Sequence, residues 1–484
     1  MGQQIDIKTK IHDRFSIEFK VGFLARSKDR NADFNVGMWI FVPKSLDINA
    51  ATYPKNDFYR DVKSNVRLIT PKFLLRDMAD PLAKVSAACE AMASNASKDN
   101  IAEYEYQIKM FAAIVKSALR DETDHILASD RDINYLCEQY CANIQKVIEE
   151  FRALRNIINT PSVPSEQMET WQYCDEFICN VSAQHSFKLI NFLEEQNNGT
   201  YTAVISALKT FIRSINAYRD EMGYSSVRES VSHNDRNYLY RHGVLKKFVE
   251  SQLFLRVPKK RDGVVVEQLY YSIAAGLAMI FATVIAWAFQ KTFGNLTWPL
   301  FIALIISYML KDRIKELMRY YFAHKVGSKY FDNKAKIELK GKQIGWLKEG
   351  VDFISSKNLP DDIVRLRAQQ PLLKAANRID DDKIILYRKS VHIDREKMSD
   401  GSSYNLDGIN DIIRLHVNTF VQKMDNPIIP MHVLEPDDSV GLVDCEKDYY
   451  LNIVLQYEFD GAADYKRFRI TMTRDGIKNI EQIV

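Results

Sequence analysis

LYYSIAAGLAMIFATVIAWAF, at residues 269–289, is the stretch that decides the fold of this 484-residue chain. Its 21 residues carry no charge, and a helix needs about 20 apolar residues to cross the hydrocarbon core of a bilayer. A second uncharged run of 18 residues, FGNLTWPLFIALIISYML, follows at residues 293–310. The two runs predict a hairpin of two transmembrane helices. The alternative is a pair of core helices in a water-soluble protein.

Basic residues stand just outside the two runs, whereas the segment between them offers only Lys291. Cytoplasmic loops of membrane proteins are enriched in Lys and Arg, so we expect both large parts of the chain in the cytoplasm, most simply at a bacterial inner membrane. The same charges suit anionic lipid headgroups. The flanking residues are Arg256, Lys259, Lys260 and Arg261 before the hairpin, and Lys311, Arg313, Lys315 and Arg319 after it.

Small residues recur at every fourth position of the predicted spans, and such stripes let two helices approach closely. We expect them to pack the hairpin on itself, with a subunit interface as the alternative. Neither span contains an ionisable side chain, which disfavours a transporter. An oligomeric membrane-permeabilising effector stays open as an alternative. The stripe consists of Ala274, Ala278, Ala282 and Ala286, followed by Ala303 and Ser307.

The chain as a whole has the composition of a globular protein, with 66 Lys and Arg against 63 Asp and Glu. This near balance gives no global basic field for nucleic acid. Apolar and polar residues alternate at residues 16–23 and 35–42, as in half-buried strands, and apolar residues recur with helical spacing after residue 80. The predicted parts are a small β element at 1–79, a cytosolic helical bundle at 80–255, the hairpin with its flanks at 256–325, and a cytosolic β-rich domain at 326–484.

RNYLYRH, at residues 236–242, is the best local motif on a predicted helix. It resembles the motif of the HEPN ribonucleases, which has an arginine, a polar residue, a four-residue spacer and a histidine. The resemblance implies that Arg236 and His242 act on the scissile phosphate and the 2′-hydroxyl of RNA, in a dimer that pairs two motifs. The structural alternative places both residues on a solvated helix leading to the membrane.

Other catalytic signatures are absent from the sequence, including phosphate-binding loops, nucleophile elbows and zinc-binding motifs. Cys137, Cys141, Cys174 and Cys179 lack the spacing of a zinc site, so we expect buried structural cysteines and no metal or other cofactor.

The predicted fold class is therefore an α+β membrane protein. We expect a membrane-anchored cytosolic scaffold or regulatory protein without a catalytic motif rather than an enzyme. Its expected partners are the lipid bilayer, further copies of itself and a cytosolic protein. Nucleic acid is a partner only under the alternative of a membrane-tethered HEPN-like ribonuclease effector.

Overall fold

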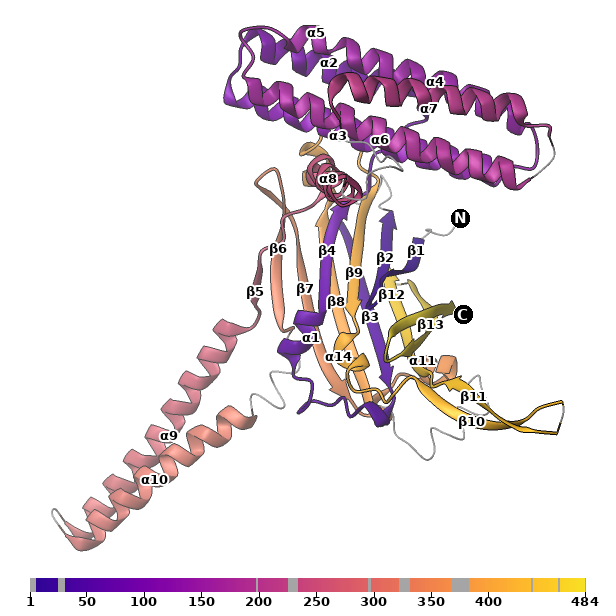
Figure 1. Ribbon diagram of the computed structural model, residues 1–484. Helices are drawn as coiled ribbons and strands as arrows, with labels where there is room; N and C mark the ends of the chain where they lie inside the picture. The colour runs from indigo at the N-terminus through magenta and orange to yellow at the C-terminus, as the bar shows by residue number, and fades with distance from the viewer. Residues whose placement is uncertain are drawn as a thin grey trace. The chain divides into compact units, whose positions relative to one another are not determined.

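The chain has a mixed α+β architecture, which confirms the coarse fold prediction (Figure 1). The computed structural model describes residues 6–24, 31–196, 199–224, 234–294, 297–321, 331–367, 383–436, 438–459 and 462–483. The chain divides into two compact units. The β unit comprises residues 1–66, 256–403 and 408–484, and the helical unit comprises residues 67–255 and 404–407.

Two sheets and a separate ribbon form the β unit. In the described residues the larger sheet has the order β14-β13-β12-β3-β8-β7-β6-β5, the smaller sheet has the order β1-β2-β9-β4, and β10 pairs with β11. All pairs of the larger sheet are antiparallel. The strands are β1 (Asp6–Asp13), β2 (Ser16–Leu24), β3 (Asn31–Val42), β4 (Val62–Leu68), β5 (Lys259–Arg261), β6 (Asn333–Leu339), β7 (Lys342–Ile354), β8 (Lys383–Asp394), β9 (Gly408–His416), β10 (Ile428–Leu434), β11 (Val440–Glu446), β12 (Tyr449–Phe459), β13 (Ala462–Thr473) and β14 (Gly476–Gln482).

Aromatic side chains join the two sheets face to face. Phe23 of β2 stacks on Phe34 of β3, with ring centroids 4.2 Å apart, and Phe34 stacks on Phe459 of β12 at 5.4 Å. Phe19 of β2 meets Phe468 of β13 edge to face at 5.6 Å. Alternating side chains of a strand point to opposite faces, so the alternation at residues 16–23 places these rings in the core.

Short helices occupy the connections of the β unit. Ile363 of one of them packs on Trp39 and Phe41 of β3, and on Ile384 and Val454 of the neighbouring strands. This contact buries the second face of the larger sheet at its centre. The short helices are α1 (Lys55–Asp61), α11 (Asp361–Arg367), α13 (Arg395–Asp400) and α14 (Asn418–Val421).

Strands from the two ends of the chain share both sheets. β3 lies between β8 and β12, and β2 pairs with β9. The sequence predicts two separate β parts, a small element at 1–79 and a β-rich domain at 326–484. The structure joins strands of both segments, because an exposed edge of either segment is paired by a strand of the other.

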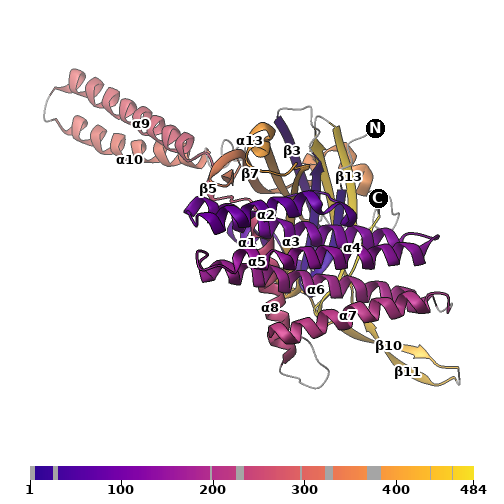
Figure 2. The same ribbon diagram turned by 90° about the horizontal axis from the view of Figure 1, so that it is seen from above.

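The helical unit is a bundle whose long helices lie side by side in Figure 2, whereas its last helix crosses them. Its core contains a stack of Phe111, Phe151 and Trp171, with ring centroids 5.5 and 5.8 Å apart. The Ser97 hydroxyl accepts a hydrogen bond from the Asn100 amide and caps one helix. The helices are α2 (Ala79–Ser94), α3 (Lys98–Leu127), α4 (Ile133–Ala153), α5 (Arg155–Ile158), α6 (Ser165–Glu195), α7 (Thr202–Met222) and α8 (Asn234–Val249).

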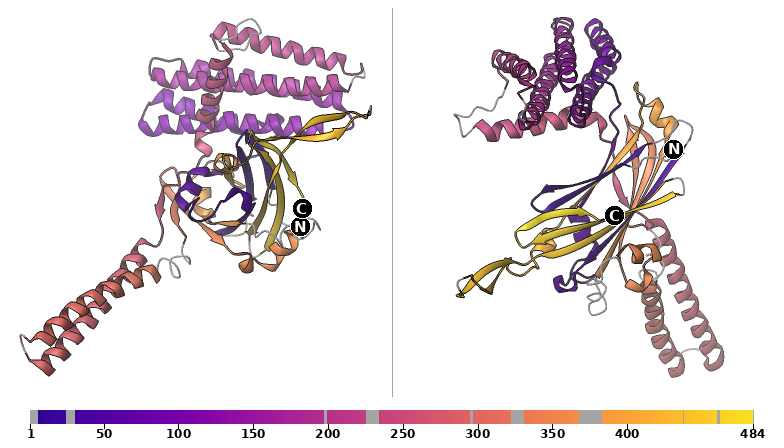
Figure 3. Two further views of the ribbon diagram at one scale, coloured as in Figure 1. Left: turned by 60° about the horizontal axis from the view of Figure 1, so that its bottom comes forward. Right: turned by 90° about the vertical axis from the view of Figure 1, so that its right-hand side faces the viewer.

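The predicted spans fold as two helices that run side by side, α9 (Val264–Phe293) and α10 (Trp298–Tyr321) (Figure 3). Among the described helices, α9 alone is long and apolar enough to cross a membrane, by length and composition. In α10 the apolar residues give way after Leu310 to Lys311, Asp312, Arg313 and Lys315. The prediction of two transmembrane helices is therefore not confirmed.

Candidate functional site

The strand that precedes the α9–α10 hairpin and the strand that follows it pair with each other in the larger sheet. β5 leads into α9 through Asp262 and Gly263, and β6 resumes the sheet after the hairpin. Arg261 of β5 is the register partner of Asn333 of β6. Gly263 has a φ of 71°, a left-handed conformation that glycine adopts without steric cost, and this turns the chain from strand to helix. We name residues 259–263 and 331–333 the hairpin joint.

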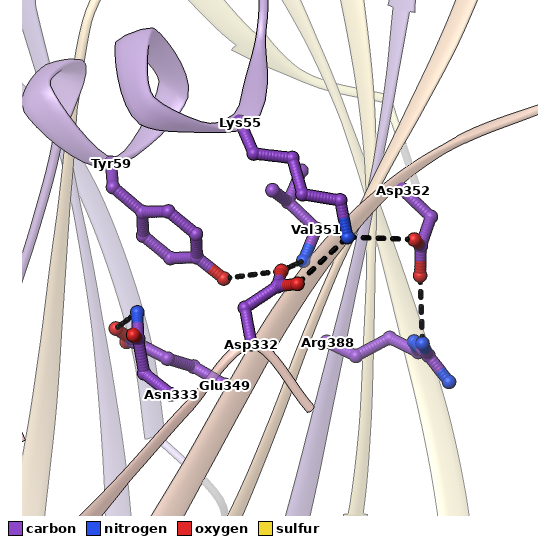
Figure 4. Close-up of polar contacts among 8 residues, drawn as sticks. All are labelled: Lys55, Tyr59, Asp332, Asn333, Glu349, Val351, Asp352 and Arg388. Carbon is purple, nitrogen blue, oxygen red and sulfur yellow. Dashed lines mark hydrogen bonds and ion pairs between the residues drawn. The ribbon is translucent and has the colours of Figure 1, made fainter. Parts of the chain in front are cut away.

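Asp332 is the centre of the joint (Figure 4). Its carboxylate accepts hydrogen bonds from the Lys55 ammonium at 2.7 Å, the Tyr59 hydroxyl at 2.9 Å and the Val351 amide at 2.8 Å. Burial raises the pKa of Tyr59, and the neighbouring Asp332 carboxylate raises it further. Tyr59 therefore stays a neutral hydrogen-bond donor, and α1 is tied to the residue that precedes β6.

Asp352 of β7 extends this network along the sheet. It accepts a hydrogen bond from Lys55 at 3.1 Å and pairs with Arg388 of β8 at 2.7 Å (Figure 4). Lys55 thus bridges two carboxylates, and each carboxylate has a second donor. Charge-assisted hydrogen bonds with several partners hold side chains in fixed positions.

Glu349 of β7 lies behind the joint and is 1% exposed. Its carboxylate contacts the Lys259 ammonium at 2.7 Å and accepts hydrogen bonds from the Tyr387 hydroxyl at 3.0 Å and the Asn333 side-chain amide at 3.1 Å. A buried carboxylate is costly unless it is paired and hydrogen-bonded. Lys259, predicted as a basic flanking residue, here neutralises an acid that anchors β5 and β6.

The first turns of α9 carry a further ion pair. Arg261 pairs with Glu267 at 3.0 Å, and Glu267 accepts a hydrogen bond from the Tyr271 hydroxyl at 2.9 Å. The Arg319 guanidinium of α10 lies 5.1 Å from the centroid of the Tyr271 ring. These contacts connect the joint to both helices.

An open pocket of about 430 Å³ lies at the joint. Its described lining residues carry charges of both signs and include no Ser, Cys or His. The arrangement is suited to binding and positioning. The lining residues are Lys55, Asn56, Tyr59, Arg261, Asp262, Gly263, Glu267, Phe331, Asp332 and Asn333.

No family model, curated protein or solved structure matches this chain. The geometry of the described residues therefore carries the functional argument.

The remaining basic flanking residues lie on β5, beside it and on α10. Arg256 exchanges two backbone hydrogen bonds with Glu338, and Lys260 is exposed on β5. On α10, Lys311 lies 4.1 Å from the ring centroid of Tyr308. Lys315 lies 4.0 Å from Asp312, and Arg313 is exposed.

The small-residue stripe lies along the contact between α9 and α10. Ala274, Ala278, Ala303 and Ser307 are buried there, and the Ser307 hydroxyl donates a hydrogen bond to the Ala282 carbonyl at 3.3 Å. Ala282 and Ala286 are partly buried.

The HEPN-like motif lies on α8. The side chain of Arg236 falls outside the described residues. His242 is half-buried and stacks on Tyr238, and burial followed by nearby Lys246 lowers its pKa. The adjacent Arg241 makes a two-pronged ion pair with buried Glu176, at 2.6 to 3.0 Å. Ribonuclease activity stays a prediction.

Sequence analysis missed Lys55, Asp332, Glu349 and Asp352. They come from three segments of the chain, and each lies in an ordinary polar context in the sequence. The pairing of β6 with β7 brings the three acids together, and Lys55 of α1 contacts two of them. Among the described residues, no group of three or more His, Cys, Asp or Glu side chains is placed to hold a metal ion.

Proposed function

We propose that the α9–α10 hairpin anchors the chain in a lipid bilayer and that the two units act as a scaffold or regulatory module at its cytoplasmic face. The observation that carries this proposal is the distribution of side chains on the hairpin. Small residues fill the contact between the helices, and large apolar residues point outward.

A hairpin that folds in water is expected to have the opposite distribution, with its large apolar side chains buried and polar side chains outward. The most apolar 18-residue window of α9 has a mean hydropathy of 2.1 and is 11% buried. Soluble proteins rarely expose apolar patches larger than a few hundred Å². The exposed apolar side chains include Leu269, Ile273, Leu277, Ile280 and Val284 of α9, and Phe301, Ile302, Leu304, Ile305 and Ile306 of α10.

The shorter apolar part of α10 is compatible with this anchor. From Trp298 to Leu310 it has 13 residues, which rise about 20 Å as a helix. Long basic side chains beyond it can extend their charged groups to the interface. The joint supports a scaffold because its ion pairs and strand pairing fix the start of α9 to the sheet.

Carbonate extraction and vesicle flotation of the full chain test the anchor. Leu277→Arg with Ile280→Arg places two charges on the exposed apolar surface and should release the protein from membranes. The control is Leu317→Arg, on an exposed position in the basic part of α10. A charged pair that leaves the protein in the membrane fraction would contradict the proposal.

Thiol labelling of intact cells tests the orientation. Cys445 on β11 is exposed and should react with a membrane-impermeant maleimide only after lysis. In a Cys445→Ser background, a cysteine replacing exposed Thr292 at the far end of α9 should react before lysis. The opposite pattern would reverse the proposed topology.

A further inference from the structure

One side of the pocket at the hairpin joint offers two adjacent charges of opposite sign. The Arg261 side chain is 70% exposed, and its ion pair with Glu267 occupies only part of a guanidinium that has five donors. The neighbouring Asp262 carboxylate accepts no hydrogen bond from the described part of the chain, although the Asp262 amide donates to the Asp332 carbonyl at 3.0 Å. A cation and an anion thus remain accessible beside the same pocket.

The exposed surface changes from polar to apolar as α9 leaves this pocket. Val264, Val265 and Val266 are exposed in its first turn, Val265 at 81%, and Leu269 follows at 60%. A ligand that fits both surfaces has a polar end for the pocket and an apolar end for α9.

We propose that this pocket binds the headgroup of a zwitterionic phospholipid with a primary ammonium, its phosphate at Arg261 and its ammonium at Asp262. The inference rests on the proposed membrane anchor and assigns a lipid class to the joint. Arg donates paired hydrogen bonds to phosphate oxygens, and a carboxylate accepts from an ammonium. The acyl chains follow the apolar residues of α9.

The charge of the pocket selects this headgroup over an anionic one. Lys55 and Arg261 oppose three carboxylates, those of Asp262, Glu267 and Asp332. A headgroup that carries only a phosphate leaves the Asp262 carboxylate unpaired and close to the negative charge of that phosphate. A headgroup that carries both charges satisfies both residues.

Native mass spectrometry of the full chain in detergent tests the proposal. The ligands are dihexanoyl phosphatidylethanolamine, dihexanoyl phosphatidylglycerol and free phosphoethanolamine. We expect one equivalent of phosphatidylethanolamine to bind, about tenfold more tightly than either of the others. Equal binding of free phosphoethanolamine would identify a soluble ligand instead of a lipid, and equal binding of phosphatidylglycerol would remove the role of Asp262. Either result overturns the proposal.

Matched variants locate the site. Arg261→Gln and Asp262→Asn should each weaken phosphatidylethanolamine binding about tenfold. Arg261→Lys keeps the positive charge and should weaken binding less than Arg261→Gln. Arg313→Gln and Asp312→Asn make the same charge changes at the other flank of the hairpin, outside the pocket, and should leave binding unchanged. If the control variants lost as much binding as the pocket variants, the lipid would be held by general attraction to charge, and the assignment would be overturned.

Flotation of the same variants separates this inference from the anchor. Variants that remain inserted but bind phosphatidylethanolamine like the wild type would overturn the headgroup site and leave the anchor intact. A wild-type chain that does not insert would overturn both.

Discussion

Lys389 and Asp411 are a fully buried ion pair inside the β unit. Lys389 of β8 contacts Asp411 of β9 and donates to the Ser64 hydroxyl of β4 at 2.6 Å. Burial lowers the pKa of Lys389 and raises the pKa of Asp411, since each charged form loses its hydration. The pair joins a strand of the larger sheet to two strands of the smaller one.

Removing one partner of this pair should cost more than removing both. Lys389→Met leaves a buried carboxylate without its cation, and we expect the free energy of unfolding to fall by about 3 to 5 kcal/mol. The double variant Lys389→Met with Asp411→Leu should recover most of that loss. Urea unfolding of the four proteins forms a double-mutant cycle. Additive losses would show that the two residues contribute independently.

His185 of α6 should make the helical unit sensitive to acid. Its Nδ1 is buried without a partner in the described residues, and burial lowers its pKa from 6.5 to about 4. The unfolded chain therefore binds a proton more readily than the folded one between these values, so stability falls as pH falls from 6.5 to 4. Partial exposure limits the expected loss to about 2 kcal/mol.

Hydrogen exchange of the α6 segment at several pH values measures this effect. His185→Gln should flatten the dependence between pH 6.5 and 4. His432→Gln changes an exposed histidine on β10 and should leave it unaltered. If His185→Gln lost as much stability between pH 6.5 and 4 as the wild type, other titrating groups would be responsible for the acid sensitivity.

At the level of elements, the contact between α9 and α10 depends on small side chains. Ala278 is 1% exposed at this contact, whereas a Cβ added to Gly276 would meet no atom within 4 Å. Ala278→Leu should push the helices apart at a cost of about 1 to 3 kcal/mol. Gly276→Leu adds a similar bulk to an open position and is the matched control.

Disulfide trapping reports the separation of the two helices. Cysteines replacing Ala282 and Ser307 in a Cys445→Ser background should cross-link readily, because the Ser307 hydroxyl lies 3.3 Å from the Ala282 carbonyl. Ala278→Leu should reduce the cross-linked fraction, and Gly276→Leu should not. An unchanged yield with Ala278→Leu would mean that the helices absorb the larger side chain.

Element periodicity was readable from the sequence, whereas the pairing of elements was not. The alternating segments at residues 16–23 and 35–42 lie within β2 and β3, although side chains on both faces of β2 and of the second half of β3 are buried. Their neighbours β9, β8 and β12 lie hundreds of residues away. Register depends on contacts across that distance, which a local pattern does not encode. The joint residues could not be found for the same reason.

For the whole molecule, the structure predicts which pieces of the chain can fold alone. Fragment 67–255 contains nearly all of the helical unit in one continuous segment, lacking only residues 404–407. Fragment 326–484 lacks β3, the strand that joins β8 to β12, and also Phe23 and Phe34 of the core. We expect 67–255 to be helical and to melt cooperatively, and 326–484 to aggregate.

Size-exclusion chromatography and circular dichroism of the two fragments check this expectation. Adding residues 1–66 in trans should improve the solubility of 326–484, because they supply β2 and β3. A monomeric, strand-rich 326–484 fragment would show that the larger sheet divides into independent parts.

The position of β3 in the sequence also determines when the larger sheet can form during synthesis. About 340 residues separate the end of β3 at Val42 from the start of β8 at Lys383. At ribosomal rates of about 5 to 20 residues per second, β3 waits roughly 20 to 70 seconds for its first neighbour. The helical unit and the hairpin emerge within that interval. The apolar strand β3 is therefore unpaired while the intervening chain is made, and we expect the yield in cells to depend on chaperones that shield the first 66 residues.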